Sequence, residues 1–271
     1  MPKLAVLDIG TNSIHMVLAE VQPDYTYKIL DRFKDMTRLG DGVFTSRRLS
    51  DQAMMRGLEV IRNLVTLARN KGYERIEGVA TSAVREARNG GEFLDHVAQQ
   101  TGLTVRVITG AEEARLIFLG VQNSVALPEP PTLVIDIGGG SVEVIVGNRE
   151  TIYQARSLKL GAIRLKDLYL TKTPPSKAML HELEEAVTGQ LKQALGTYKT
   201  KRVEQIIATS GMAGNLAEVI YLQRTGRPLQ QLNLTKISAK EIAAVEKRLA
   251  DATLKTRLAM PGLDPKRVDT L

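Results

Sequence analysis

The chain has 271 residues, enough for two domains of about 100 to 150 residues, and its 43% hydrophobic and 25% charged residues are typical of a globular protein. Its net charge of +7 is uneven, because residues 1–123 carry 16 Lys and Arg against 15 Asp and Glu, whereas residues 124–271 carry 21 against 15. The absence of Cys excludes disulfides, thiolate catalysis and Cys-ligated zinc, and 4% aromatic residues leave few stacking platforms for single-stranded nucleic acid.

Membrane and export signals are not evident in the sequence. No stretch approaches the roughly 18 apolar residues of a membrane span, and the first residues predict a strand rather than a signal peptide. We therefore expect a cytoplasmic protein without membrane or nucleic-acid partners, and a homodimer is compatible with this composition. The basic second half indicates either a site for a polyanion or a solvated surface.

The first half predicts an α/β unit. Apolar alternation and helical spacing give strands at 3–7, 13–21, 25–33, 76–81 and 105–108 and helices at 50–70 and 92–100. Ser50 has the character of an N-cap, and Gly72 follows the helix as its stop signal. The apolar positions of these elements should form the core of the unit.

The turn between the first two strands has residues suited to a phosphate. Glycine lets the backbone approach a ligand closely and take positive φ, and successive N–H groups of such a turn can surround an anion. Hydroxyl and amide side chains add donors. The expected phosphate-binding residues are Asp8, Gly10, Thr11, Asn12 and Ser13.

A loop rich in hydroxyls and arginine is expected at 80–90, after a strand. Ser82 is a candidate phosphate ligand, and the planar guanidinium of Arg85 could contact two phosphate oxygens at once. The alternative is that Arg85 is simply solvated.

A helix is expected at 109–121, and its first turn carries Glu112 and Glu113. Acids at this position are stabilised by the helix dipole, which is sufficient to explain one of them. The other could take a proton from water if it points into an active site. Pro128, Pro130 and Pro131 then indicate a linker, so that the predicted domains are 1–123 and 124–271.

The second half begins with an apolar strand that ends in Asp136, turns through Gly138, Gly139, Gly140 and Ser141, and continues into a second strand carrying Glu143. The turn predicts a second phosphate site. Asp136 and Glu143 would repel a phosphate unless a divalent cation lay between them, and we therefore expect them to bind a metal.

Residues 7–18 superpose without a gap on residues 135–146, with Asp8 on Asp136, Gly10 on Gly138 and Ser13 on Ser141. Two copies of one loop indicate a duplicated domain with the loops facing each other. In this alignment His15 takes the place of Glu143. The role of His15 is left open, because a histidine packed in a strand would fit as well.

The rest of the second half repeats the α/β pattern, with strands expected at 133–137, 141–146, 152–159 and 203–209 and helices at 161–169, 176–198, 236–248 and 254–258. The segment 210–216 predicts a turn of small residues before a helix that ends near Arg224. Ser210 and Gly211 are candidate phosphate ligands there, although ordinary packing of a strand against a helix often has the same composition.

Together these motifs resemble the exopolyphosphatase/guanosine pentaphosphate phosphohydrolase (Ppx/GppA) family. The resemblance covers nearly the whole chain: the two phosphate loops, the Arg-bearing loop, the connecting helix with its acid, and the motif that lies near adenosine in nucleotide-binding relatives. These are residues 8–13, 136–143, 81–89, 110–120 and 208–214. It implies an α/β fold of two duplicated actin-like, ribonuclease H-like domains with a cleft between them, as in sugar kinases, Hsp70 and actin.

The resemblance also implies an activity. Glu113, rather than Glu112, would activate water, Asp136 and Glu143 would bind Mg²⁺ or Mn²⁺, and Arg85 with the loop amides would hold the phosphoryl group. We expect terminal orthophosphate to be released from inorganic polyphosphate. The alternatives are hydrolysis of guanosine pentaphosphate (pppGpp), a catalytically weak module that binds guanosine penta- or tetraphosphate or polyphosphate, and, third, a kinase.

Two further expectations concern the extent of the chain and its basic half. The sequence is similar to the short form of the family, without its helical HD-type domain, and the second domain should lack a C-terminal helix that relatives have. A polyanion track is predicted along the second half, and its candidate contacts are Lys159, Arg164, Lys166, Lys266 and Arg267.

Overall fold

A computed structural model describes residues 2–24, 26–196, 203–230 and 234–271. It divides into two compact units, Met1–Glu113 and Ala114–Leu271. The division falls within one helix, α5 (Gly110–Ser124), and therefore precedes the 123/124 boundary predicted from the linker prolines. In the described part of the chain, no helix combines the length and the apolar character needed to cross a membrane.

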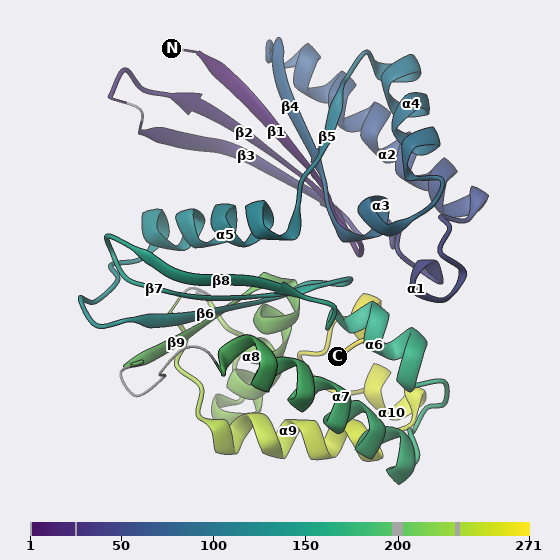
Figure 1. Cartoon of the computed structure of the whole chain (residues 1–271), viewed down its shortest axis with the longest axis vertical. Coiled ribbons are helices and arrows are strands. Elements are labelled where there is room, and N and C mark those ends of the chain that lie inside the picture. Colours follow the sequence, from purple (N-terminus) through teal and green to yellow (C-terminus); the bar gives the residue numbers. More distant parts are fainter. Residues whose placement is uncertain (1, 25, 197–202, 231–233) are drawn as a thin grey trace. The chain divides into compact units, whose positions relative to one another are not determined.

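The first unit is a five-stranded sheet with helices on one face. Its sheet has the order β3-β2-β1-β4-β5, in which the first three strands are antiparallel and β4 and β5 run parallel to β1. Helices α2 and α4 lie side by side (Figure 1), and their buried faces include Ile61, Val65, Phe93 and Val97. The elements are β1 (Lys3–Ile9), β2 (Ile14–Val21), β3 (Tyr27–Asp35), α1 (Val43–Ser46), α2 (Asp51–Asn70), β4 (Arg75–Ala80), α3 (Ser82–Glu86), α4 (Gly90–Thr101) and β5 (Val105–Val107).

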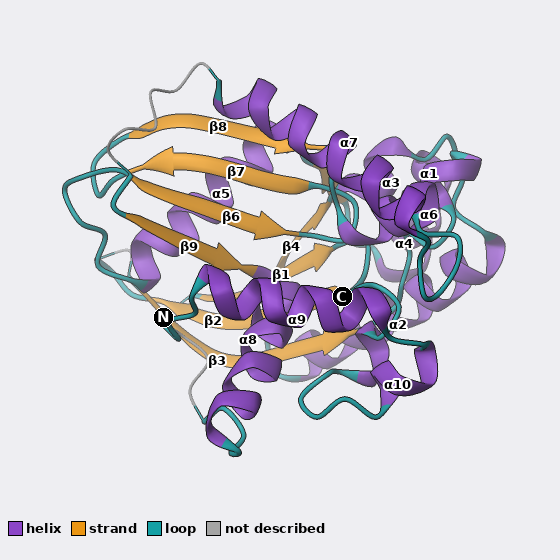
Figure 2. Cartoon of the chain, turned by 90° about the horizontal axis from the view of Figure 1, so that it is seen from below, coloured by secondary structure: helices purple, strands orange, loops and turns teal. Residues whose placement is uncertain are grey.

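The second unit has a four-stranded sheet of order β8-β7-β6-β9 (Figure 2) that is covered on both faces. Phe118 and Val121 of α5 pack against Val134 and Ile145 on one side, and α7 packs on the other, so that every residue of β7 is buried. The elements after α5 are β6 (Thr132–Ile137), β7 (Val142–Gly147), β8 (Ile152–Leu158), α6 (Ala162–Tyr169), α7 (Lys177–Leu195), β9 (Gln205–Thr209), α8 (Ser210–Thr225), α9 (Ala239–Asp251), α10 (Leu254–Leu258) and the 3₁₀ turn η1 (Pro265–Arg267).

The four strands of the second sheet repeat the topology of β3, β2, β1 and β4 in the first, which confirms the predicted duplication and the actin-like α/β fold class. In each unit a three-stranded antiparallel meander is followed by a helical segment and a strand that pairs in parallel with the first strand of the meander. Register is repeated as well: Asp8 pairs with His15 across β1 and β2, and Asp136 pairs with Glu143 across β6 and β7.

Most predicted elements are found within two or three residues of their expected bounds, and two segments differ in kind. The loop predicted at 80–90 contains helix α3, and the turn predicted at 210–216 is the first part of helix α8. The first is a single turn and too short to show helical periodicity, and the second consists of small residues that do not mark a helix by their pattern. The predicted end of the helix at Tyr198 and the predicted start of the third strand at Tyr25 lie outside the described residues.

The C-terminal segment is tied to α9 by a buried arginine. Arg257 donates to the carbonyl oxygens of Leu249, Val268 and Leu271, at 2.7 to 3.3 Å. Because burial disfavours the charged form, the pKa of this guanidinium is lowered, and the nearby Asp269 partly opposes that change. The segment encloses a small core against α8 and α9 that includes Val219, Ile220, Val245, Leu249, Met260, Leu263 and Val268.

Candidate active site

The first predicted phosphate loop is a closed turn between β1 and β2. The N–H of Gly10 donates to the carbonyl of Ser13 at 3.1 Å, and a Cβ on Gly10 would lie 2.8 Å from that oxygen. The carbonyls of Thr11 and Asn12 accept hydrogen bonds from Gly40 N (2.8 Å) and from Arg38 N (2.9 Å). Backbone contacts thus fix the loop on several sides.

The second loop repeats this turn. Gly138 N donates to Ser141 O at 3.0 Å, and a Cβ on Gly138 would lie 2.9 Å from that oxygen. Glycine allows both positive φ and a close approach of other atoms, and no glycine of either loop has positive φ. At Gly10 and Gly138 it is the close approach of a carbonyl that requires glycine.

The start of α6 lies against the second loop. Ala162 N donates to Gly138 O, Ile163 N and Arg164 N donate to Gly139 O, and the Arg164 Nε donates to Gly140 O at 2.6 Å. Arg164 is only 6% exposed. Its guanidinium supports the backbone of the loop from inside the unit.

The two predicted metal ligands lie opposite each other at the end of the β6–β7 hairpin, and a neighbouring hydroxyl orients each of them. Thr209 donates to Asp136 Oδ2 at 2.5 Å, and Ser157 donates to Glu143 Oε1 at 2.7 Å. Glu143 is 1% exposed. Burial raises the pKa of Asp136, and the hydrogen bond from Thr209 partly opposes that effect.

The chemistry of this pair fits a small divalent cation. The described residues contain no cluster of three or more His, Cys, Asp or Glu side chains arranged for a metal. Mg²⁺ is commonly held by only one or two carboxylates, with substrate phosphates and water completing its shell, so two hard oxygen donors suffice. A cation there would also favour the ionised form of Asp136, which burial alone disfavours.

The carboxyl ends of the parallel strands in the first unit bring together the loop, Arg85 and Glu113. Thr81 N donates to Ile9 O, next to the loop, and Ile108 N donates to Ala80 O. Helix α3, with Arg85, and helix α5, with Glu113, therefore both begin beside the ends of β1, β4 and β5. Ligand sites of open α/β sheets commonly form at such ends.

Arg85 and Glu113 form an ion pair there. Arg85 Nη1 donates to Glu113 Oε2 at 3.0 Å and to Ile108 O at 2.8 Å, and the side chains are 23% and 15% exposed. Glu112, the other acid of the first turn, instead pairs with Arg106 at 2.6 Å and is 33% exposed. The two acids thus differ in partner and exposure, and Glu113 is the one that pairs with Arg85.

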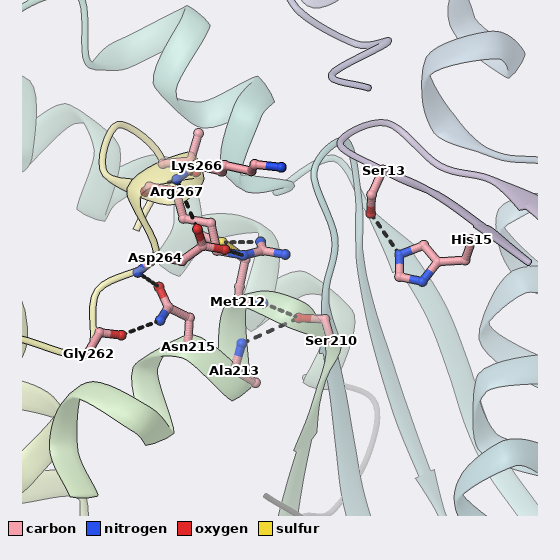
Figure 3. Close-up of polar contacts among 11 residues, drawn as sticks. Ser13, His15, Ser210, Met212, Ala213, Asn215, Gly262, Asp264, Lys266 and Arg267 are labelled. Carbon is pink, nitrogen blue, oxygen red and sulfur yellow. Dashed lines mark hydrogen bonds and ion pairs between the residues drawn. The ribbon is translucent and has the colours of Figure 1, made fainter. Parts of the chain in front are cut away.

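Two other candidate phosphate ligands have local partners. Ser82 is buried and donates to Glu86 Oε1 at 3.2 Å within α3. Ser210 has φ 97°, and its Oγ accepts from the backbone N–H groups of Met212 (3.1 Å) and Ala213 (3.4 Å), as Figure 3 shows. This hydroxyl oxygen therefore caps the helix that Gly211 continues.

The start of α8 is also joined to the C-terminal segment. Asn215 donates to Gly262 O at 2.7 Å and accepts from Asp264 N at 3.1 Å (Figure 3). The segment 210–216, which was predicted as a turn of small residues, thus contacts residues about fifty positions later in the chain.

The predicted polyanion track is not supported. Arg164 supports the second loop, Lys166 Nζ lies 2.5 Å from Asp269 Oδ2, and Arg267 is 4% exposed and contacts Asp264 and the sulfur of Met212. Three of the five candidates thus have structural contacts, two through buried guanidinium groups and Lys166 through an ion pair. Lys159 and Lys266 are exposed.

Sequence reasoning missed three supporting contacts. Thr209 and Ser157 orient the carboxylate pair, and Ser13 Oγ lies 2.8 Å from His15 Nε2. Thr209 ends a strand that the sequence predicted, and the structure pairs that strand in parallel with β6, with Thr209 opposite Asp136. The contact of Ser157 depends on the register of β7 and β8. The contact of His15 is local, with a residue two positions earlier in the chain.

Comparison with known proteins finds relatives that match nearly the whole chain. Exopolyphosphatase 2 of Mycobacterium tuberculosis (strain CDC 1551 / Oshkosh) is 29% identical over 281 residues, covering 100% of this chain and 87% of that protein. The crystal structure of an exopolyphosphatase from Cytophaga hutchinsonii has a TM-score of 0.87 and 30% identity, covering 99% of this chain and 86% of that one. A Ppx/GppA family member of Aquifex aeolicus has a TM-score of 0.77 and 26% identity, covering 99% and 86%.

The family profile gives the assignment. The profile described as the Ppx/GppA phosphatase family matches residues 7–271, which include both phosphate loops, Arg85 and Glu113. The match begins just before the first loop and extends through the C-terminal segment. The chain belongs to the Ppx/GppA phosphatase family.

Proposed function

We propose that this protein releases terminal orthophosphate from inorganic polyphosphate, with Glu113 as the general base and Asp136 and Glu143 as ligands of Mg²⁺ or Mn²⁺. The observation that carries the proposal is the pairing of Glu113 with Arg85 beside the first phosphate loop. The names of the relatives, Exopolyphosphatase 2 and exopolyphosphatase, support the substrate class.

The proposed roles follow from the chemistry of the groups. The Glu113 carboxylate takes a proton from the attacking water, which general bases do at a gain of roughly 10² to 10⁴ in rate. Arg85 has five N–H donors, and one nitrogen already contacts Glu113 and Ile108 O. Its remaining donors can bind phosphate oxygens while the contact with Glu113 orients the base.

The carboxylate pair supplies the second part of the mechanism. A divalent cation bound there would offset negative charge on the phosphate chain and on the leaving group. Thr209 and Ser157 hold Asp136 and Glu143 in place by hydrogen bonds, so the donors are oriented before the cation binds.

Hydrolysis of pppGpp is the second candidate, and one observation favours keeping it. A track of cations along the basic second half would favour a long polyphosphate chain over the nucleotide. Three of the cations predicted for that track, Arg164, Lys166 and Arg267, instead have structural contacts. Without a track of several cations, the two substrates should depend similarly on salt.

The test is a phosphate-release assay on polyphosphate and pppGpp side by side, with Mg²⁺, with EDTA and with ATP plus candidate acceptors. We expect release from polyphosphate that stops with EDTA. Faster release from pppGpp would reverse the order of substrates, binding without release would indicate a regulatory module, and transfer from ATP to an acceptor would indicate a kinase. Release that persists in EDTA would refute the metal assignment.

A further inference from the structure

A serine hydroxyl and an imidazole form a pair at the start of β2, beside the first loop. Ser13 Oγ and His15 Nε2 lie 2.8 Å apart, and both residues are partly buried (Figure 3). The carbonyl of Ser13 closes the loop by accepting from Gly10 N. His15 therefore touches the side chain of a residue whose backbone belongs to the proposed phosphate site.

The neighbours of His15 carry charge. Its cross-strand partners are Asp8 on β1 and Lys34 on β3. At the equivalent ladder position of the second hairpin stands Glu143, whose carboxylate accepts a hydroxyl proton from Ser157. The two hairpins thus place different hydrogen-bonding groups at the same point, since imidazole can donate or accept and an ionised carboxylate only accepts.

A serine hydroxyl has one proton to donate and can accept two hydrogen bonds. Phosphate oxygens of a polyphosphate are mainly acceptors, so Ser13 binds them by donating that proton. If His15 accepted the proton, Ser13 could not donate it to the ligand. If His15 donates from Nε2, the hydroxyl proton remains available.

We propose that His15 is a positioning residue whose Nε2–H donates to Ser13 Oγ and thereby directs the Ser13 hydroxyl proton toward phosphate bound at the first loop. The inference rests on the proposed function, because it takes phosphate as the ligand. His15 acts through Ser13 and does not itself touch the reacting atoms.

The experiment is a double-mutant cycle on binding. Affinity of the full chain for a methylene-bridged, non-hydrolysable analogue of tripolyphosphate is measured by calorimetry with Mg²⁺ present, for wild type, Ser13→Ala, His15→Leu and the double variant. Loss of a hydrogen bond to a charged ligand should weaken binding roughly tenfold in each single variant. The double variant should bind no more weakly than Ser13→Ala alone, because His15 has nothing left to orient.

Two variants serve as controls. His15→Gln keeps an amide donor and should restore affinity to within about threefold of wild type, a rescue that a purely structural role would not give. Ser141→Ala changes the other loop and should be independent of His15. The fold loss of affinity in the Ser141→Ala/His15→Leu double variant should therefore equal the product of the two single losses. Thermal unfolding checks that each variant is folded. If His15→Leu does not fold, His15→Ala, which also lacks a side-chain donor, replaces it in the cycle with Ser13→Ala, and the same outcomes apply.

The outcomes separate this inference from the function on which it rests. Equal losses from His15→Leu in the wild-type and the Ser13→Ala backgrounds, or no loss at all while wild type binds normally, would overturn the role of His15 and leave the proposed function intact. Failure of wild type to bind the analogue or to release phosphate would overturn both.

Discussion

The β1–β2 and β6–β7 hairpins have the same backbone and different chemistry. In both, a glycine N–H binds the carbonyl of the serine three residues later, at 3.1 and 3.0 Å, and an aspartate is the penultimate residue of the first strand. Opposite that aspartate stands His15 in the first hairpin and Glu143 in the second. The duplicated hairpins thus share a backbone turn but differ in the pair of side chains that faces across it. The second hairpin has two carboxylates, which we propose bind a cation, and the first has an aspartate and a histidine.

The largest effect should come from the acid that accompanies the first hairpin. Glu113→Gln keeps the shape of the side chain and removes the base, so kcat should fall roughly 10²- to 10⁴-fold while KM changes little. Glu112→Gln is the matched control, since Glu112 pairs with Arg106 at a more exposed position. Similar losses in the two variants would show that the base has been assigned to the wrong residue.

The metal requirement should distinguish the two hairpins directly. Asp136→Asn and Glu143→Gln should each raise the Mg²⁺ concentration for half-maximal activity roughly tenfold or more, because they remove a hard oxygen ligand. Asp8→Asn, at the equivalent position of the first hairpin, should shift it far less. Titration of activity with Mg²⁺ measures the effect, and an equal shift in all three variants would refute the asymmetry.

The shared backbone of the hairpins should respond equally to the same substitution. Gly10→Ala and Gly138→Ala each push a Cβ to within 2.8 or 2.9 Å of a serine carbonyl, and each should cost about 1–3 kcal/mol of stability. Gly120→Ala, where a Cβ meets nothing within 4 Å, is the control and should be neutral or stabilising. Thermal unfolding of the three variants measures these effects. If only one of the two loop variants were destabilised, the two loops would not share the same constraint.

A smaller effect should appear in the pH dependence of stability. Burial raises the folded-state pKa of Asp136 above its unfolded value, so the folded protein binds this proton more tightly. The resulting stability is present at low pH and is lost as pH rises through the folded pKa. Without metal, Asp136→Asn should therefore raise Tm by a few degrees at neutral pH, with a gain that shrinks on acidification. A gain independent of pH would show that the charge of Asp136 is not its cause.

Much of the fold was predictable because local signals were strong. Ser50 caps α2, which ends at Asn70 as expected, since both the capping side chain and the apolar spacing are in the sequence. The duplicated loops were visible as an ungapped repeat. What escaped prediction depends on distant partners: the burial of Arg164 and Arg267 requires carbonyls and a sulfur from other elements, and helix α3 is too short to carry a period.

The support of the second loop by α6 bears on how readily an anion could bind. The carbonyls of Gly138, Gly139 and Gly140 all accept hydrogen bonds from the start of α6 or from Arg164. In a planar trans peptide the N–H points opposite to the C=O, so the N–H groups that follow these carbonyls are directed away from α6. A phosphate would bind to N–H groups that folding has already oriented. Its affinity would therefore not be reduced by the conformational entropy of ordering a loop.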